Sequence, residues 1–182
     1  KYYDQGIDWD ALDVARAVAL VRSVDAKTRA LDDAIIQVTV AIAWHQRTIQ
    51  INTSDGVDAA DNQPFYTLRL GVVMKNGDET QSNSSNFAAL DGFESITGEK
   101  IDALVREAVE DTRILFRSVK PRGGEMPIVL GSGASGILLH EAIGHGLEAD
   151  FNRKGQSIFS SKIGTKVASP EVTIFDTGLI EN

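Results

Sequence analysis

The dipeptide Asn76-Gly77 restricts how this chain can fold more than any other feature of its sequence. It separates residues 66–75, which are rich in apolar and β-branched side chains, from residues 78–84. Asn and Gly reach positive φ angles at low energetic cost, and the two-residue turn of a β-hairpin needs such angles. The sequence therefore predicts an antiparallel hairpin, and with it an antiparallel sheet.

Two more strands are predicted on the N-terminal side of this hairpin. Residues 34–43 (AIIQVTVAIA) and 48–52 (TIQIN) are rich in β-branched residues and alternate in places, which is typical of strands. Asp55-Gly56 then favours a turn before the chain reaches the hairpin.

Two amphipathic helices are predicted beside the sheet. Apolar residues recur with a helical period in residues 10–24 and again in residues 99–116. Asp8 and Asp10 suit the N-terminus of the first helix, where a carboxylate accepts backbone N–H groups. Residues 1–119 are therefore predicted to form an α+β domain, an antiparallel sheet with flanking helices.

A linker at residues 120–124 (KPRGG) marks a domain boundary, because the character of the sequence changes after it. Residues 126–130 (MPIVL) are typical of a short buried strand, and residues 172–175 (VTIF) of another. A glycine-rich loop and a helix lie between them. Residues 120–182 are therefore predicted to be the start of a second α/β unit that carries this helix.

The glycine-rich loop matches a nucleotide-binding pattern, G-x-G-x-x-G, at Gly131, Gly133 and Gly136. In dinucleotide-binding folds an acidic residue ends the next strand about 20 residues later, whereas here that strand ends near Asp176, roughly twice as far away. A tight turn that packs the helix on its strand is the simpler interpretation. A third is that backbone N–H groups of the loop bind a carboxylate or an oxyanion.

The helix after this loop contains His140-Glu141-Ala142-Ile143-Gly144-His145, two histidines five residues apart with a glutamate between them. A regular α-helix advances about 100° per residue, so positions five apart diverge by about 140° and cannot hold one metal ion. A π-bulge or an early end of the helix removes this obstacle. Gly144 and Gly146 make both easier, because they have no Cβ. We therefore predict that the helix departs from α-geometry between Glu141 and Gly146.

With such a bend the two imidazoles suit Zn²⁺, and Glu141 lies where the catalytic base of a zinc hydrolase lies. The alternative is that both histidines are ordinary polar residues near a helix end, where a cation favours the helix dipole. The third histidine, His45, is predicted to be a surface residue at a strand end. Glu148 and Asp150 are either further ligands, acceptors for imidazole N–H groups, or solvated charges.

Composition excludes several other classes of function. The chain has 182 residues, 42% of them hydrophobic, which suffices for a buried core, and a net charge of -8, which argues against direct nucleic-acid binding. It contains no apolar run long enough for a membrane span and no signal peptide, although it begins at Lys1 without a Met. The absence of cysteine fits a reducing compartment, so we expect a cytoplasmic location.

The residues from Gly131 to Asn182 closely resemble the TldD branch of the TldD/PmbA family, also called modulator of DNA gyrase. The resemblance rests on HEAIGHGLEADFNRKG, followed by FSSKIG and VTIFD. That family is characterised by an H-E-x-x-x-H zinc motif. Residues from about Asp25 to Val119, including NTSDG and GFE, look like its central domain, more loosely.

The resemblance implies a zinc metalloprotease that cuts unstructured peptides inside a closed chamber. It would act as a heterodimer with the sister subunit PmbA (TldE), which lacks the histidine pair, and its implied substrates are peptide antibiotic precursors and unfolded antitoxins. By position, His140 and His145 would be zinc ligands and Glu141 the catalytic base.

The resemblance also implies parts that this sequence does not contain. The third zinc ligand of the family is a cysteine far downstream, and the N-terminal domain of the family precedes Lys1. We therefore expect an internal piece of a longer protein, with 1–119 as the central domain and 120–182 as the truncated start of the metalloprotease domain. Such a piece would bind zinc poorly and self-associate through exposed apolar surface.

A noncatalytic function is the main alternative. In it the chain is a peptide-binding or regulatory module whose sheet edge takes up an extended peptide as an added strand, and the histidines are incidental.

Overall fold

The computed structural model describes residues 13–90, 93–133 and 135–175. These residues form two compact units, the first ending at Lys120 and the second beginning at Pro121. Within the described ranges, each helix is too short or too polar to span a lipid bilayer.

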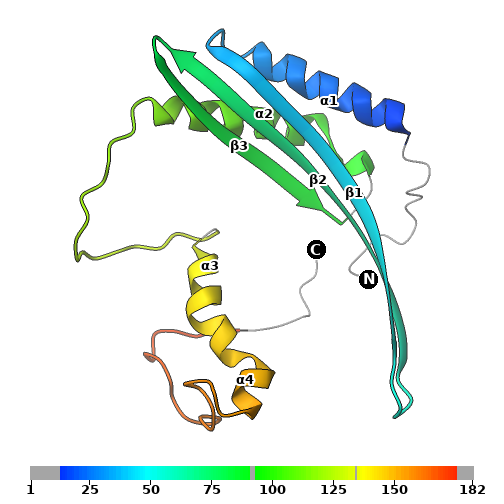
Figure 1. Ribbon diagram of the computed structural model, residues 1–182, viewed down its shortest axis with the longest axis vertical. Helices are drawn as coiled ribbons and strands as arrows, with labels where there is room; N and C mark the ends of the chain where they lie inside the picture. The colour runs from blue at the N-terminus through cyan, green and yellow to red at the C-terminus, as the bar shows by residue number, and fades with distance from the viewer. Residues whose placement is uncertain (1–12, 91–92, 134, 176–182) are drawn as a thin grey trace. The chain divides into compact units, whose positions relative to one another are not determined.

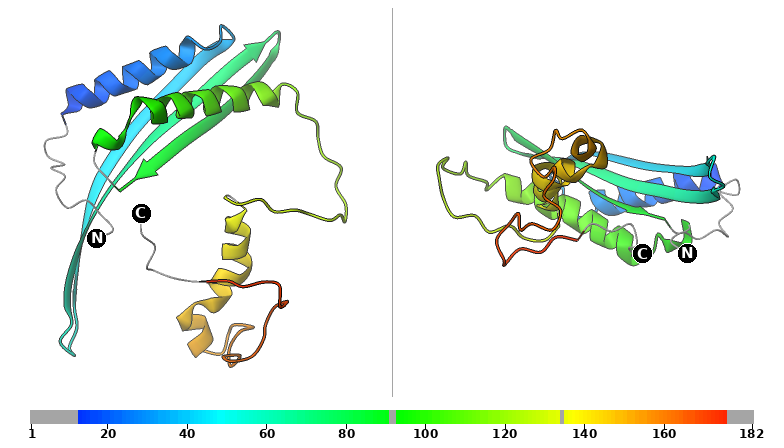
Figure 2. Two further views of the ribbon diagram at one scale, coloured as in Figure 1. Left: turned by 180° about the vertical axis from the view of Figure 1, so that it is seen from behind. Right: turned by 90° about the horizontal axis from the view of Figure 1, so that it is seen from below.

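The first unit is an antiparallel sheet of three strands with two helices on one face (Figures 1 and 2). The strands, in the order β1-β2-β3, are β1 (Ile35–Asn52), β2 (Asp58–Asn76) and β3 (Glu79–Ala89). The helices are α1 (Val14–Arg29) and α2 (Gly98–Leu115), and a short 3-10 turn (Phe93–Ser95) precedes α2. The predicted α+β class, an antiparallel sheet with flanking helices, is confirmed.

The core lies between the sheet and the two helices. Side chains on β2 alternate, so Leu68, Leu70, Val72 and Met74 are buried against the helices while their neighbours face the other way. The residues that meet them include Val24 of α1 and, on α2, Ile101, Leu104, Val105, Ala108 and Val109. The apolar stripe of α2 is therefore the face that the helical period predicts.

The hairpin between β2 and β3 is confirmed, but its turn lies one residue further along than predicted. Asn76 pairs with Glu79, which leaves Gly77 and Asp78 as the two-residue loop. Gly77 has a φ of 60°. Asp78 does not have a positive φ, because among the described residues Ser161 is the only one other than glycine that does. A type II′ turn needs a glycine at its first loop position and a residue with negative φ at its second. Gly77 and Asp78 fit this pattern, so Asn76 belongs to the strand.

Strand β1 runs without a break where two strands were predicted. Trp44 pairs with Tyr66 and Arg47 with Gln63, so the ladder continues through the segment that joins the two predicted strands. Strand β3 pairs with β2 only as far as Tyr66, so beyond that residue β1 and β2 continue as a two-stranded ribbon (Figure 1). The ribbon ends in a turn that contains Gly56, with a φ of 95°, as predicted.

Both predicted helices are present, with different bounds. The side chain of Asp13 caps α1 by accepting the Ala15 N–H, and the helix continues to Arg29, five residues beyond the predicted end. Asp8 and Asp10, the predicted N-terminal residues of this helix, lie outside the described residues. Thr97 caps α2 by accepting the Lys100 N–H.

The second unit contains no strand among its described residues, so the predictions for residues 126–130 and 172–175 were wrong. Neither segment has regular secondary structure, and Val129 is 96% exposed. A strand needs a neighbouring strand for its backbone hydrogen bonds, and no described segment provides one. The unit is built instead from α3 (Gly136–Leu139), a π-helical turn (His140–Gly144), a 3-10 turn (His145–Leu147) and α4 (Ala149–Arg153).

Candidate metal centre

The two histidines of the second unit are brought together by the π-helical turn. The His145 N–H donates to the His140 carbonyl oxygen, a bond that spans five residues where an α-helix spans four. The wider turn places residue 145 beneath residue 140, and the two imidazole ring centroids are 4.7 Å apart, with planes at 77°. The predicted departure from α-geometry between Glu141 and Gly146 is therefore confirmed.

The three side chains His140, Glu141 and His145 form a group that suits a metal ion. One ligand atom from each lies within 4.8 Å of the others, and all three side chains are exposed. Two ligand atoms at 2.0 to 2.1 Å from one zinc ion are at most about 4.2 Å apart, so small side-chain rotations suffice. Imidazole and carboxylate are donors that zinc accepts, and the group therefore fits the metal implied by the motif.

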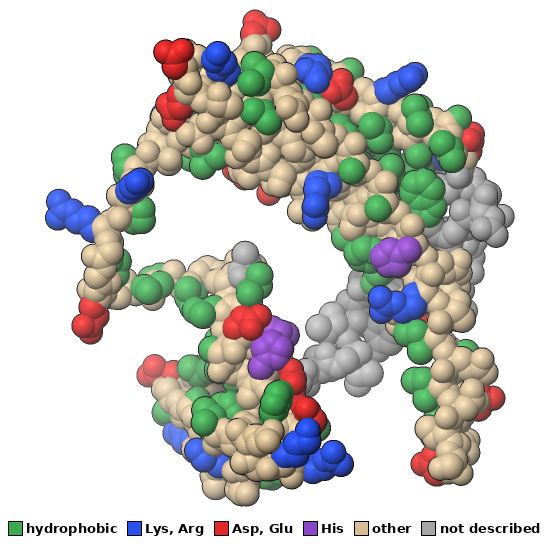
Figure 3. All heavy atoms as spheres, viewed as in Figure 1, with side chains coloured by type: hydrophobic (Ala, Val, Ile, Leu, Met, Phe, Trp, Pro, Cys, Tyr) green, Lys and Arg blue, Asp and Glu red, His purple; other side chains and the backbone are tan. Residues whose placement is uncertain are grey.

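The carboxylate of Glu141 lies close to one ring nitrogen of His145. Its Oε2 lies 3.5 Å from His145 Nε2, four residues along the same wide turn. A carboxylate in that position stands next to whatever the imidazole binds, as a base for metal-assisted hydrolysis must. In the space-filling view, acidic side chains lie next to the histidine surface of the second unit (Figure 3).

The other nitrogen of His145 contacts Glu148. His145 Nδ1 lies 2.6 Å from Glu148 Oε1. The hydrogen bond and charge of Glu148, followed by the charge of Glu141, raise the pKa of His145 above its ordinary value. Glu148 was predicted to be a further ligand, an acceptor for an imidazole N–H group, or a solvated charge. The structure shows it as the acceptor for the N–H of His145. Asp150 lies outside the group of His140, Glu141 and His145.

Gly144 and Gly146 were both expected to ease a bend of the helix, but the structure gives them different roles. Gly144 has helical angles, φ -56° and ψ -52°, and a Cβ there would meet the His140 ring at an ordinary 3.7 Å. A Cβ on Gly146 would lie 2.8 Å from the Phe159 ring. Gly146 is therefore required for the close approach of Phe159, whereas the backbone freedom of Gly144 is not used.

Sequence reasoning missed the residues that hold the end of this helix. Asn152 Nδ2 donates to the carbonyl oxygens of Gly146 and Glu148, each at 2.9 Å, and Ser157 Oγ donates to that of Gly146. The bonds to Gly146 satisfy a carbonyl group that the end of the helix leaves without a backbone partner. Asn152 lies in the segment FNRKG, and Ser157 lies just before the segment FSSKIG. Both segments were noted only as part of the family resemblance.

The glycine-rich loop is a tight turn. Gly133 has a φ of 100°, the Gly136 N–H donates to the Gly133 carbonyl oxygen at 2.8 Å, and Ser135 Oγ donates to the Gly131 carbonyl oxygen. The predicted strand before it is absent, so the strand, turn and helix of a dinucleotide fingerprint do not occur together.

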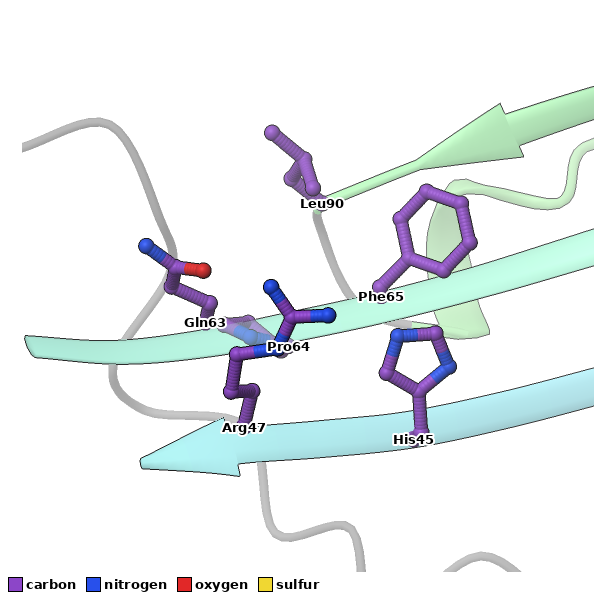
Figure 4. A pocket seen from close by; sticks show the side chains of 6 residues that line it. All are labelled: His45, Arg47, Gln63, Pro64, Phe65 and Leu90. Carbon is purple, nitrogen blue, oxygen red and sulfur yellow. The ribbon is translucent and has the colours of Figure 1, made fainter. Parts of the chain in front are cut away.

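His45 is exposed, as predicted, but lies within β1 rather than at a strand end. Its ring tilts against Phe65, with centroids 4.9 Å apart. Both rings line a cavity of about 330 Å³, shown in Figure 4. The other residues that line it are Arg47, Gln63, Pro64 and Leu90. Among the described residues, His45 belongs to no group of three metal-ligating side chains.

Two family models match this chain in sequence order. The PmbA/TldA metallopeptidase central domain matches residues 7–116, and the PmbA/TldA metallopeptidase C-terminal domain matches residues 123–182. The chain is 36% identical over 178 residues to a metalloprotease TldD homolog of Haemophilus influenzae, covering 95% of this chain and 37% of that protein. It is 31% identical to a metalloprotease of Methanothermobacter thermautotrophicus, covering 86% of this chain and 35% of that protein.

Two solved structures share the fold. A Bacteroides thetaiotaomicron protein described as a modulator of DNA gyrase superposes with a TM-score of 0.74 at 18% identity, over 93% of this chain and 37% of that one. A Thermotoga maritima protein with the same description gives 0.70 at 17% identity, over 91% and 37%. The chain thus spans little more than a third of the length of its relatives. With two matching family models and 36% identity over nearly its whole length, the chain belongs to the TldD/PmbA metallopeptidase family.

Proposed function

We propose that this chain supplies the catalytic motif of a zinc-dependent peptidase of the TldD type. The observation that carries the proposal is the π-helical turn, which gathers His140, Glu141 and His145 into one group despite their spacing. Membership of a metallopeptidase family supports it, and so do relatives named as metalloproteases.

In this proposal each residue of the group has one role. The imidazoles of His140 and His145 would hold the metal ion, which when bound would supply Lewis acidity that polarises a peptide carbonyl and lowers the pKa of water. Glu141 accepts a proton from the water molecule whose oxygen attacks the carbonyl carbon. As the C–N bond breaks, Glu141 passes this proton to the leaving amine nitrogen.

Two imidazoles are one ligand short of the three protein ligands that catalytic zinc ordinarily has. The cysteine-free chain has no thiolate to offer. We therefore place the third ligand, a cysteine by resemblance to the family, outside this chain.

Substrate and partner are proposed from the family. The substrates are unstructured peptides, cut in a closed chamber formed with a PmbA/TldE-like sister subunit in the cytoplasm. Co-expression of the full-length protein with such a subunit, followed by a pull-down and a peptidase assay of each alone and of the pair, tests this assembly.

The substitution Glu141→Gln in the full-length protein tests the catalytic role. It removes the base but keeps the size and polarity of the side chain, so we expect peptide cleavage to fall by about 100- to 10,000-fold while zinc content stays unchanged. Peptidase rates and elemental analysis measure the two quantities. Glu171→Gln, an exposed acid elsewhere in the second unit, is the matched control and keeps full activity.

Two results would contradict the proposal. Cleavage by the Glu141→Gln protein at the rate of the unmodified protein would remove Glu141 as the base. Unchanged zinc content in a His140→Ala, His145→Ala double variant would place the metal elsewhere.

A noncatalytic peptide-binding module is the second candidate. Within the described residues, β1 and β3 each pair with one strand only, so each has an open edge on which an extended peptide can form an added strand. A full-length protein that binds peptides but contains no metal and cleaves nothing would favour this function over the enzyme.

A further inference from the structure

Glu148 occupies a position at which its side chain has no role in the local backbone structure. It is the N-cap residue of α4, and its side chain makes no capping hydrogen bond. Ser, Thr, Asp and Asn are the favoured residues at such a position, because their short side chains reach back to the first N–H groups of the helix. The carboxylate of Glu148 is therefore free to be used elsewhere.

The 3-10 turn directs that carboxylate to His145. In a 3-10 helix, side chains three residues apart lie above one another, and Glu148 follows His145 by three. Glu148 Oε1 lies 2.6 Å from His145 Nδ1, a short distance for a hydrogen bond between a ring nitrogen and a carboxylate.

This contact determines which nitrogen of His145 can bind a metal. An ionised carboxylate only accepts hydrogen bonds, so Nδ1 must carry the proton, and the lone pair of the neutral ring is then on Nε2. Nε2 is the atom that lies 3.5 Å from Glu141 Oε2, within the group that suits a metal ion. Glu148 thus presents the lone pair of His145 to the site.

The backbone at Glu148 is itself held in place. Its carbonyl oxygen accepts the backbone N–H of Asn152 at 3.1 Å and the side-chain Nδ2 of Asn152 at 2.9 Å. The same Nδ2 lies 2.9 Å from the carbonyl oxygen of Gly146, on the other side of the turn. Asn152 therefore ties Glu148 to the segment that carries His145.

We propose that Glu148 is a positioning residue, which holds His145 in the tautomer and ring orientation needed to bind the metal ion through Nε2. This inference rests on the proposed function, since it concerns the same metal centre. It adds a residue that does not touch the metal or the substrate.

Two measurements on the full-length protein test the inference. The first is ¹⁵N NMR of labelled histidines in the metal-free protein, which tells the protonated ring nitrogen from the one with the lone pair. His145→Gln assigns the signal. We expect protonation at Nδ1 in the unmodified protein, and a shift toward the Nε2-protonated form, which a free imidazole prefers, in Glu148→Ala.

The second is zinc affinity, measured by competition with a chromophoric chelator. Loss of such a partner typically weakens metal binding by about 10- to 100-fold, and we expect this for Glu148→Ala. Glu148→Gln keeps an acceptor oxygen at the same reach, so its loss should be smaller. The control Asp150→Ala removes the same charge two residues away and should leave affinity nearly unchanged.

Three results would overturn the inference. They are an unchanged tautomer in Glu148→Ala, an equal loss of affinity in Asp150→Ala, and a Co²⁺ spectrum of Glu148→Gln that shows one oxygen ligand fewer, which would make Glu148 a ligand. If the unmodified protein bound no zinc, the proposed function would fail. The tautomer in the metal-free protein would still decide the role of Glu148.

Discussion

Gly146 shows how closely the turn that carries His145 packs against the Phe159 ring. A Cβ at this position would lie 2.8 Å from the Phe159 ring, well inside van der Waals contact. The ring of Phe159 belongs to a segment anchored by Ser157, whose Oγ accepts the Phe159 N–H at 3.1 Å and donates to the Gly146 carbonyl oxygen. The ring therefore has little room to retreat.

We expect Gly146→Ala to displace the turn that carries His145 and to weaken zinc binding by about 10-fold or more, since overpacking of this kind costs about 1 to 3 kcal/mol. Gly144→Ala is the matched control. Its Cβ would meet the His140 ring at 3.7 Å, and Ala is favoured over Gly in helices, so affinity should be kept. Zinc titration of both variants checks this, and equal behaviour of the two would contradict the packing argument.

At the scale of elements, Asp32 connects the turn before β1 to helix α2. Its Oδ1 accepts the Ala34 N–H at 2.9 Å and its Oδ2 accepts Arg113 Nε at 2.7 Å. Arg113 also donates to the Leu31 carbonyl oxygen at 3.0 Å. The Ala34 hydrogen bond, followed by that from Arg113, lowers the pKa of Asp32 below its ordinary value of 3.8.

A lowered pKa makes this contribution to stability dependent on pH. The ionised form is favoured in the folded state, so the stabilisation is fully present above pH 3.8 and is lost as the pH falls through the lower, folded pKa. We expect Asp32→Asn to reduce the free energy of unfolding by about 1 kcal/mol at neutral pH, and the two proteins to converge in acid. Denaturant unfolding at several pH values measures this.

Asp33→Asn is the control for this prediction, because Asp33 is an exposed neighbour that carries the same charge. A constant difference between Asp32→Asn and the unmodified protein at every pH would mean that ionisation of Asp32 does not contribute.

At the scale of the whole molecule, the two units differ in how they bury apolar surface. The first has a core between sheet and helices, with Leu68, Leu70 and Val109 fully buried. In the second, none of the described residues is buried, and large apolar side chains such as Val129, Ile163 and Phe175 are 87% exposed or more. Exposed apolar surface of this extent is typical of faces that contact another chain or segment.

We expect this chain, when isolated, to self-associate as its concentration rises, because association removes apolar side chains of the second unit from water. Static light scattering across a concentration series measures it. The paired substitutions Val129→Asp and Ile163→Asp should reduce association, whereas Val14→Asp, at an exposed position in the first unit, should not. A clean monomer at all concentrations would contradict the prediction.

The sequence by itself determined the features that depend on neighbours along the chain. The helical period of α2 places its buried stripe, the alternation along β2 places the core face of the sheet, and a glycine with positive φ makes the hairpin. The same local reasoning required a wide turn between His140 and His145, because five residues of α-helix would separate their side chains.

Only the tertiary structure decided the features that need a partner distant in the sequence. Pairing with β2 carries β1 through Trp44 to Arg47, and the register of that sheet moves the hairpin turn to Gly77 and Asp78. Residues 126–130 have strand-like composition but form no strand, because a strand is completed by hydrogen bonds to another segment. Asn152 and Phe159 likewise contact the candidate site only in the folded chain. No spacing rule in the sequence links a side chain to a carbonyl group or a glycine across a loop.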